Sequence, residues 1–386
     1  MLFNGIAQTA YRRSVATGLQ GDGSYRLTPD HTLRAGVFVQ GERSTSATNS
    51  LVLGLNPDGS QVSDQPFSIV DGSGKTGWLY GVYLQDEWKI TSKLTVNFGA
   101  RFDLVDDFTH EQQLSPRINV VWEPVDGTTL HAGYARYFTP PPFELISNTT
   151  VALLANTSGA PPGTQNDVAK AERAHYFDAG VNQVVLPGLK VGADAYFKIA
   201  KNLVDEGQFG APILLTPFNY EKGLVKGVEL TASYDVDNWS LYGNFAISKA
   251  LGKNITSGQF NFSPDDLAFI AGHYIHLDHD QTYTASAGVA YTFPTQTKLS
   301  VDLIHGSGLR AGGDTPNGHS LPDYNQVNLS LVQKIVTGWL TGLELRLDVI
   351  NLLDAKYEIR DGTGVGVGAP QFGPRRTVLA GLTQRF

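Results

Sequence analysis

The stretch LTVNFGARFD, residues 94–103, decides the fold class of this chain. Its apolar and polar residues alternate without interruption. The apolar residues are Leu94, Val96, Phe98, Ala100 and Phe102, and the polar or small ones are Thr95, Asn97, Gly99, Arg101 and Asp103. Because successive side chains of a β-strand point to opposite faces, this spacing predicts a strand with one apolar face and one polar face.

The same alternation recurs from one end of the chain to the other, for example in KGVELTASYD (226–235) and GLELRLDV (342–349). Many of these segments are ten residues or longer, whereas strands of globular sheets average about five or six residues. A tilted strand of about ten residues spans a bilayer, and an apolar outer face with a polar inner face is typical of membrane barrels. We therefore predict an all-β fold, an antiparallel transmembrane outer-membrane β-barrel.

The connections between the alternating segments support this fold. Every second connection is a tight turn such as LPG (186–188), and most of the others are long, such as 139–170 and 253–280. Short turns at one rim and long loops at the other are typical of outer-membrane barrels, whose long loops face outward. The predicted strands lie near 14–27, 32–48, 76–90, 94–108, 114–124, 129–138, 171–186, 189–206, 217–236, 239–252, 281–293, 297–309, 323–335, 341–359 and 374–386.

The count of about fifteen strands is odd, and an antiparallel barrel of one bacterial chain needs an even number. An open sheet edge in lipid leaves backbone groups without hydrogen bonds. Either residues 2–12 supply a sixteenth strand, or the chain lacks an N-terminal part of the barrel. The start MLFNGIAQTAYRR (1–13) has no apolar segment of a signal peptide, which favours the second explanation.

Composition excludes several classes of function. With 29 Lys and Arg against 37 Asp and Glu, the chain has no basic excess for binding nucleic acid. The sequence has no cysteine, so disulfides and thiolate metal sites are ruled out. No apolar run reaches the roughly 18 residues of a transmembrane helix.

Several stretches resemble the C-terminal barrel region of TonB-dependent outer-membrane receptors. They are LYGVYLQDEWKITSKLTVNFGARFD (79–103), GYARYFTPPPFELI (133–146), KNLVDEG (201–207), NYEKGLVKGVELTASY (219–234), NLLDAKYEI (351–359) and the ending GPRRTVLAGLTQRF (373–386). The resemblance implies a 22-stranded barrel, of which this chain would supply the last fifteen strands. Residues 1–386 would then be the C-terminal part of the barrel domain, and no plug domain or TonB box would be present.

The resemblance also implies a function in the bacterial outer membrane. The parent receptor would bind a large scarce nutrient, such as a ferric siderophore, vitamin B12, haem or a glycan, and import it with energy from the inner membrane. It would be a carrier and not an enzyme, without a cofactor. Its partners would be outer-membrane lipid and lipopolysaccharide, the barrel-assembly machinery, a small-molecule or metal-chelate ligand, and the TonB complex through the missing N-terminal part.

Three alternatives stay open at this point. The first is a passive porin-like channel of sixteen strands, and the second is a receptor fragment without function. The third is a soluble secreted all-β adhesin, which would not need detergent to stay in solution.

Four sets of candidate site residues follow from these patterns. Charged residues on the polar faces are expected to line the barrel lumen: Arg101, Asp103, Asp194, Glu229, Glu344, Arg346 and Asp348. Aromatic residues in the long loops are candidate external ligand contacts: Phe143, Phe209, Phe260, Phe262, Phe269 and Tyr274. By the resemblance, the terminal Phe386 is an assembly signal, and it should share the apolar face of Val378, Ala380 and Leu382.

The fourth set is a weak candidate metal site in GHYIHLDHDQ, residues 272–281, made of His273, His276 and Asp278. Imidazole and carboxylate groups suit first-row divalent ions. In a strand, however, His276 and Asp278 would share one face, while His273 and His279 would point the other way. The sequence therefore favours a solvated rim over a metal site.

Overall fold

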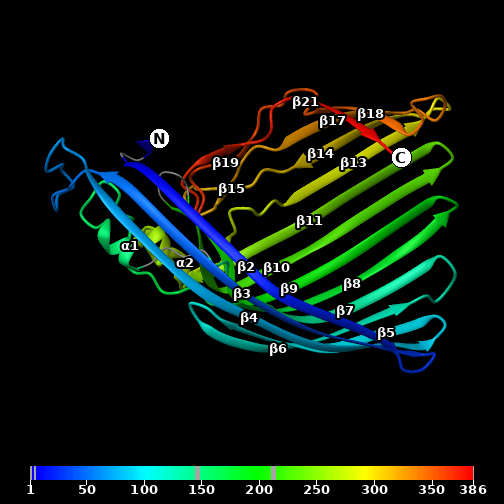
Figure 1. The fold of residues 1–386 in the computed structure, drawn as a ribbon, viewed down its shortest axis with the longest axis horizontal. Coiled ribbons are helices and arrows are strands. Elements are labelled where there is room, and N and C mark those ends of the chain that lie inside the picture. The colour runs from blue at the N-terminus through cyan, green and yellow to red at the C-terminus, as the bar shows by residue number, and fades with distance from the viewer. Residues whose placement is uncertain (1, 4–5, 144–147, 210–213, 386) are drawn as a thin grey trace.

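Fifteen long strands form one antiparallel sheet in the computed structural model, which describes residues 2–3, 6–143, 148–209 and 214–385. Each strand pairs with the next along the chain, so the sheet is a meander (Figure 1). This confirms the predicted all-β antiparallel fold. The strands are β2 (Ile6–Arg26), β3 (His31–Val52), β4 (Phe67–Thr91), β5 (Leu94–Asp106), β6 (His110–Trp122), β7 (Thr128–Thr139), β8 (Glu172–Leu186), β9 (Leu189–Phe209), β10 (Leu214–Val236), β11 (Trp239–Ile255), β13 (Tyr283–Thr292), β14 (Thr297–Gly306), β17 (Tyr324–Lys334), β18 (Leu343–Ile350) and β21 (Thr377–Gln384).

Apart from β1, which precedes β2, the short elements lie in the long connections, at the rim opposite the tight turns (Figure 1). Neither α-helix in the described part of the chain is long and apolar enough to cross a membrane. The short elements are β1 (Leu2–Phe3), α1 (Asn148–Leu153), the 3-10 turn η1 (Gln259–Asn261), α2 (Pro264–Gly272), β12 (Ile275–His276), β15 (Arg310–Ala311), β16 (His319–Ser320), β19 (Glu358–Asp361) and β20 (Pro370–Phe372).

The two faces of the sheet differ as the alternation predicts. Val37, Val82, Phe102 and Leu114 form one row across β3, β4, β5 and β6, because each is paired with the next. Their exposed fractions are 58%, 48%, 38% and 57%, which would be costly for such residues in water. An apolar band of this kind is suited to contact with lipid.

The two long edge strands, β2 and β21, are not paired with each other in the described part of the sheet, because β2 pairs with β1 and β3 and β21 pairs with β18. Residues 6–12 extend β2, and β1 contributes only Leu2 and Phe3, which pair with Ala7 and Ile6. Of the two explanations left open by the sequence, the one in which residues 2–12 supply a sixteenth long strand is therefore not supported by the described residues. The alternative of a sixteen-stranded porin-like channel required that strand, so the described residues do not support it.

The strand expected at 341–359 is also shorter than the sequence suggests. β18 ends at Ile350 because the next residue, Asn351, adopts a left-handed backbone with φ 52°. Asn351 is fully buried, and its Nδ2 donates hydrogen bonds to the carbonyl oxygens of Ala355 and Pro374. These bonds favour a turn over a continued strand.

A compact apolar core fills the loop rim of the sheet. Phe218 packs edge-on against both Tyr220 and Phe262, with ring centroids 5.2 and 4.8 Å away. Asn202 adopts a left-handed backbone with φ 53°, and Leu203, the next residue, is buried in this core. The core supports the loops that form the cavity described next.

Candidate functional site

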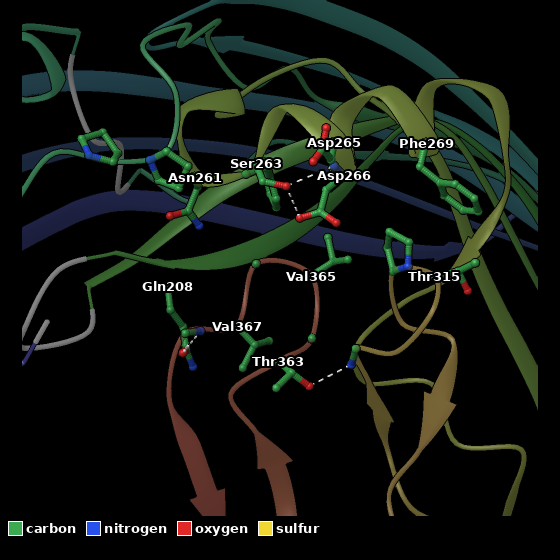
Figure 2. Close-up of a pocket in the computed structure, with 18 of the residues that line it drawn as sticks. Gln208, Asn261, Ser263, Asp265, Asp266, Phe269, Thr315, Thr363, Val365 and Val367 are labelled. Atoms are coloured by element: carbon green, nitrogen blue, oxygen red, sulfur yellow. Dashed lines mark hydrogen bonds between the residues drawn. The ribbon is translucent and has the colours of Figure 1, made fainter. Parts of the chain in front are cut away.

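A cavity of about 700 Å³ opens among the loops at this rim. Its walls come from segments far apart in the sequence, and Figure 2 shows the start of α2 facing the loop between β19 and β20 across it. The lining is rich in glycine and proline. The lining segments are 158–162, Gln208 at the end of β9, 261–269, 312–316 and 363–368.

Side chains that bind neighbouring backbone hold these loops in place. Oε1 of Gln208 accepts hydrogen bonds from the backbone N–H groups of Gly368 and Ala369, at 2.9 and 3.1 Å. Oγ1 of Thr363 accepts one from Gly312 N–H at 2.8 Å (Figure 2). The β9, β15–β16 and β19–β20 segments therefore form one connected wall.

Asn317, which is fully buried, adds a further link behind this wall. Its Nδ2 donates to the carbonyl oxygen of His276, and its Oδ1 accepts from Val365 N–H, both at 2.8 Å. Because both bonds are shielded from water, they fix the loop that carries Val365.

The opposite wall is the first turn of α2. Ser263 is its N-cap: Oγ accepts a hydrogen bond from Asp266 N–H at 3.1 Å and donates one to Asp266 Oδ2 at 2.7 Å. Pro264 follows at the first helical position. Asp265 and Asp266 sit in the first turn, where the helix dipole stabilises negative charge.

The cavity lining is acidic. Among the lining residues that the structure describes, Asp265, Asp266 and Asp314 are acidic, and none is Lys, Arg or His. Phe262 and Phe269 provide apolar surface, while Gln208, Asn261 and Thr315 provide polar side chains. Such a lining suits a neutral or cationic ligand with both apolar and hydrogen-bonding groups.

The aromatic residues expected to contact an external ligand differ in position and in exposure. Phe269 lines the cavity, and Phe262 forms a buried part of its wall. Phe260 is completely buried, so its expected exposure to an external ligand is wrong. Tyr274 is exposed and Phe143 packs on Phe108 at 5.1 Å, both outside the lining. The side chain of Phe209 lies outside the described residues.

The expected trio of His273, His276 and Asp278 does not converge. His273 Nδ1 hydrogen-bonds to the Phe269 carbonyl at 2.9 Å, and His276 Nδ1 pairs with Asp280 at 2.5 Å. The segment turns after β12, so the strand geometry assumed from the sequence is wrong.

Asp278 instead lies beside His279, with Oδ1 3.0 Å from Nδ1 of the ring, and Asp205 is 3.8 Å from the same nitrogen. These three are the group of described residues that could hold a metal ion. All three lie at the loop rim: Asp205 follows Lys201, where the apolar side of β9 ends, and Asp278 and His279 follow β12. The hydrogen bond with Asp278 raises the pKa of His279, and burial raises the pKa of Asp205 to about 7.

The charged residues expected to line the lumen all alternate with the apolar band. Two pairs form along single strands, Arg101 with Asp103 and Arg346 with Asp348, each at 2.6 Å. Asp194 lies 2.9 Å from His131 Nε2 and is paired across the sheet with Glu229. Glu344 occupies the same face as Arg346 in β18.

The sequence interpretation missed several residues that shape the site, namely Gln208, Asn317, Thr363 and Asp205. The alternating run GTGVGVGA (362–369) was a usable signal, since such a run suits a loop that closely approaches other backbone. The side chain of Asn317 could not be recognised from the sequence, because Asn is common in ordinary turns. Phe386 lies outside the described residues.

Comparison with known proteins agrees with this architecture. The family described as "TonB dependent receptor-like, beta-barrel" matches residues 3–352. Among solved structures, the copper transporter OprC is 17% identical with a TM-score of 0.65, over 99% of this chain and 57% of that one.

Two further structures are receptors by their titles, one for ferric yersiniabactin and one for pyoverdine. The ferric yersiniabactin uptake receptor FyuA from Yersinia pestis is 14% identical with a TM-score of 0.69, over 97% of this chain and 54% of that one. FpvA from Pseudomonas aeruginosa PAO1, bound to pyoverdine, is 14% identical with a TM-score of 0.63, over 99% and 54%.

At these identities the structural likeness establishes the fold, and the chain spans about half the length of each neighbour. No curated protein matches the sequence. The family match covers most of the chain and agrees with the observed sheet and its apolar band. The chain therefore belongs to the TonB-dependent receptors, a family of outer-membrane proteins of Gram-negative bacteria, and has that family's β-barrel fold.

Proposed function

We propose that this chain provides part of the membrane-spanning wall and the outer ligand cavity of a receptor that takes up a large scarce nutrient. In this proposal residues 1–386 act as the C-terminal part of a barrel domain, in line with the share of the neighbours that the chain covers. Uptake depends on energy delivered through TonB. The protein binds and carries its ligand and does not transform it.

The observation that carries the proposal is the position of the cavity. It lies at the rim of long loops, where a barrel of this kind meets the cell exterior. Its volume of about 700 Å³ lies within the usual range of ligand sites, roughly 300–1,000 Å³. Four separate loops build it, and hydrogen bonds from the buried Asn317 and from Gln208 hold the loop of residues 363–368 in place.

The lining points to a ligand class. Three carboxylates, with no basic side chain among the described lining residues, would repel a strongly anionic chelate. The favoured ligand is thus a neutral or cationic one, such as a ferric siderophore without excess negative charge. The titles of the neighbours name copper, ferric yersiniabactin and pyoverdine, and the first two support a metal-related nutrient.

Other parts of the chain take supporting roles in this proposal. Arg101, Asp103, Asp194, Glu229, Glu344, Arg346 and Asp348 form a hydrated lumen wall. The terminal Phe386 serves the barrel-assembly machinery as a recognition signal.

A blocking substitution tests the proposed site. Gly368 lines the cavity, and a Cβ there meets nothing within 4 Å, so Gly368→Trp places an indole in the cavity without a backbone clash. Gly272, at the end of α2, has equally open surroundings outside the lining, and Gly272→Trp is the matched control. Both variants are compared with the unmodified receptor for uptake of a panel of siderophores loaded with radioactive iron.

We expect Gly368→Trp to reduce uptake of one panel member at least about tenfold, because the indole occupies the space of the ligand. Gly272→Trp should retain uptake at equal amounts of folded receptor. Normal uptake by Gly368→Trp of every siderophore that the unmodified receptor carries would remove this cavity as the ligand site.

A further inference from the structure

Two aspartates and a histidine from distant segments meet at the loop rim. Asp205 comes from the loop-rim end of β9, and Asp278 and His279 follow β12. Nδ1 of His279 lies 3.0 Å from Asp278 Oδ1 and 3.8 Å from Asp205 Oδ1. Two ligand atoms that are each about 2.1 Å from a tetrahedral ion are about 3.4 Å apart. The observed distances lie on either side of that spacing, so a small adjustment would bring these atoms around one ion.

The carboxylate of Asp205 is almost completely buried and only partly hydrogen-bonded. Its side chain is 10% exposed. Its Oδ1 accepts a hydrogen bond from the Glu206 N–H at 2.9 Å, and its Oδ2 accepts none from the described residues. The neighbouring Asp278 side chain is only 4% exposed. Two carboxylates this close to each other repel, and burial strengthens the repulsion, so the pair favours a cation between them.

Arg360 holds the second carboxylate in position. Its Nε donates to Asp278 Oδ2 at 2.7 Å, and its Nη1 donates to Gln371 Oε1 at 3.3 Å. These contacts leave Oδ1 of Asp278 beside the ring of His279. Side chains that hydrogen-bond a metal-binding carboxylate from behind are a regular part of metal sites, because they fix its orientation.

A buried hydroxyl beside the cluster lacks a partner. Tyr220 is fully buried, and its hydroxyl has no hydrogen-bond partner among the described residues. Tyr220 pairs with Leu203 and Asp205 pairs with Phe218, so Tyr220 and Asp205 lie diagonally across β9 and β10 on one face. Burial, and after it the charges of Asp205 and Asp278, raise the pKa of this tyrosine. Buried hydroxyls without a protein partner are commonly satisfied by a bound water or ion.

A second cavity, of about 460 Å³, connects the cluster with solvent. Asp205, His279 and Arg360 are among its lining residues, so an ion can reach the carboxylates. Gln208 and Val367 line both this cavity and the ligand cavity. An ion at the cluster would therefore lie directly behind a wall of the ligand cavity.

We propose that Asp205, Asp278 and His279 bind a divalent first-row metal ion, with Zn²⁺ as the best fit. An imidazole together with carboxylates suits Zn²⁺, whereas Ca²⁺ and Mg²⁺ prefer oxygen ligands alone. Three protein ligands leave a position for water, and this water is a hydrogen-bond partner for the Tyr220 hydroxyl. The ion joins β9 to the segment after β12 and so stiffens the wall that carries Gln208. The site goes beyond nutrient uptake, because it holds its ion whichever ligand the receptor carries.

The test measures Zn²⁺ binding to the purified receptor, prepared without a polyhistidine tag and stripped of metal with a chelator. Isothermal titration calorimetry in detergent gives the affinity, and Mg²⁺ serves as the comparison ion. His279→Gln removes the nitrogen ligand from a half-exposed side chain. His273→Gln is the matched control, because it makes the same change in the same loop, where the ring binds the Phe269 carbonyl. Tyr220→Phe removes only the buried hydroxyl.

We expect the unmodified receptor and His273→Gln to share one saturable Zn²⁺ site that does not bind Mg²⁺ comparably. Loss of a residue that only orients a ligand costs about 10–100-fold in metal affinity, so loss of the ligand itself in His279→Gln should cost at least about 100-fold. Tyr220→Phe should weaken Zn²⁺ binding about tenfold. Its melting temperature without metal should be unchanged or higher, because the hydroxyl that it removes has no partner there.

Two results would overturn the proposal. One is the absence of saturable Zn²⁺ binding by the unmodified receptor, which would leave His279 as a protonated partner of the two aspartates. This result does not depend on the folding of any variant. The other is equal Zn²⁺ affinity of the unmodified receptor and His279→Gln, which would place any bound ion elsewhere.

Discussion

Replacing Leu230 with arginine tests the assignment of the two sheet faces. Leu230 is 48% exposed on the apolar face of β10, between Ala193 of β9 and Phe245 of β11. It lies six residues from Val236, about 20 Å along the strand and about 16 Å above the turns at a 40° tilt. The centre of an apolar band about 25 Å tall lies about 12 Å above its lower edge, so Leu230 is within about 4 Å of the midplane.

An arginine on the lipid face at this depth costs about 2–4 kcal/mol. Thr231→Arg places the same side chain one residue further, on the polar face beside Gly192 and Asn244, where water solvates it. We expect that control to cost less than about 1 kcal/mol. Leu230→Ala measures the part of the loss that comes from leucine contacts alone.

The free energy of unfolding is measured for each variant in lipid vesicles, by tryptophan fluorescence across a urea series. The predicted loss for Leu230→Arg corresponds to a ratio of about 30 to 1,000 in the folding equilibrium, against about fivefold or less for Thr231→Arg. Equal losses for Leu230→Arg and Thr231→Arg would show that both faces of β10 meet the same environment, and would refute the sidedness.

Two further predictions concern the loop rim. Asn317→Ala leaves the His276 carbonyl and the Val365 N–H without hydrogen-bond partners, which costs about 1–3 kcal/mol for each group. Hydrogen exchange should therefore accelerate in residues 310–322 and 362–370 and stay slow in β10. A uniform change of exchange rate across these segments would contradict the role of Asn317. Arg375, which donates to both carboxylate oxygens of Asp354, holds the pKa of that carboxyl well below its usual range. The stabilisation from this ion pair is present above the unfolded-state pKa of about 3.9 and is lost only at more acidic pH. Asp354→Asn should therefore lower the melting temperature equally at about pH 8 and about pH 6. A different loss at the two pH values would contradict this assignment.

The strands could be predicted from sequence because each strand carries its own signal. Alternation such as that of Leu94 to Asp103 is a local property, imposed by lipid on one side and water on the other. The tight turns at Gly188 and Asp237 carry the residues that a left-handed backbone favours. The start of β4 at Phe67 was placed too late because 67–75 is rich in Gly, Ser and Asp, which ordinarily indicate a loop.

The loop rim was harder to predict because its structure depends on contacts between distant segments. Phe260 and Phe262 lie in a polar connection, yet they pack into a core that β10 and α2 complete. Asn351 ends a strand through hydrogen bonds to a residue 23 positions away, Pro374. Asp205 and His279 approach each other only because both segments fold onto the same core.

The orientation of the barrel in the outer membrane underlies the assignment of the ligand cavity to the cell exterior. Since the chain has no cysteine, single cysteines at its two rims report their side of the membrane without background. Gly272→Cys lies at the loop rim and Asn238→Cys in a tight turn between β10 and β11. Intact cells are labelled with a membrane-impermeant maleimide. We predict that the cysteine at 272 is labelled and the one at 238 is labelled only after lysis; the reverse pattern would contradict the account.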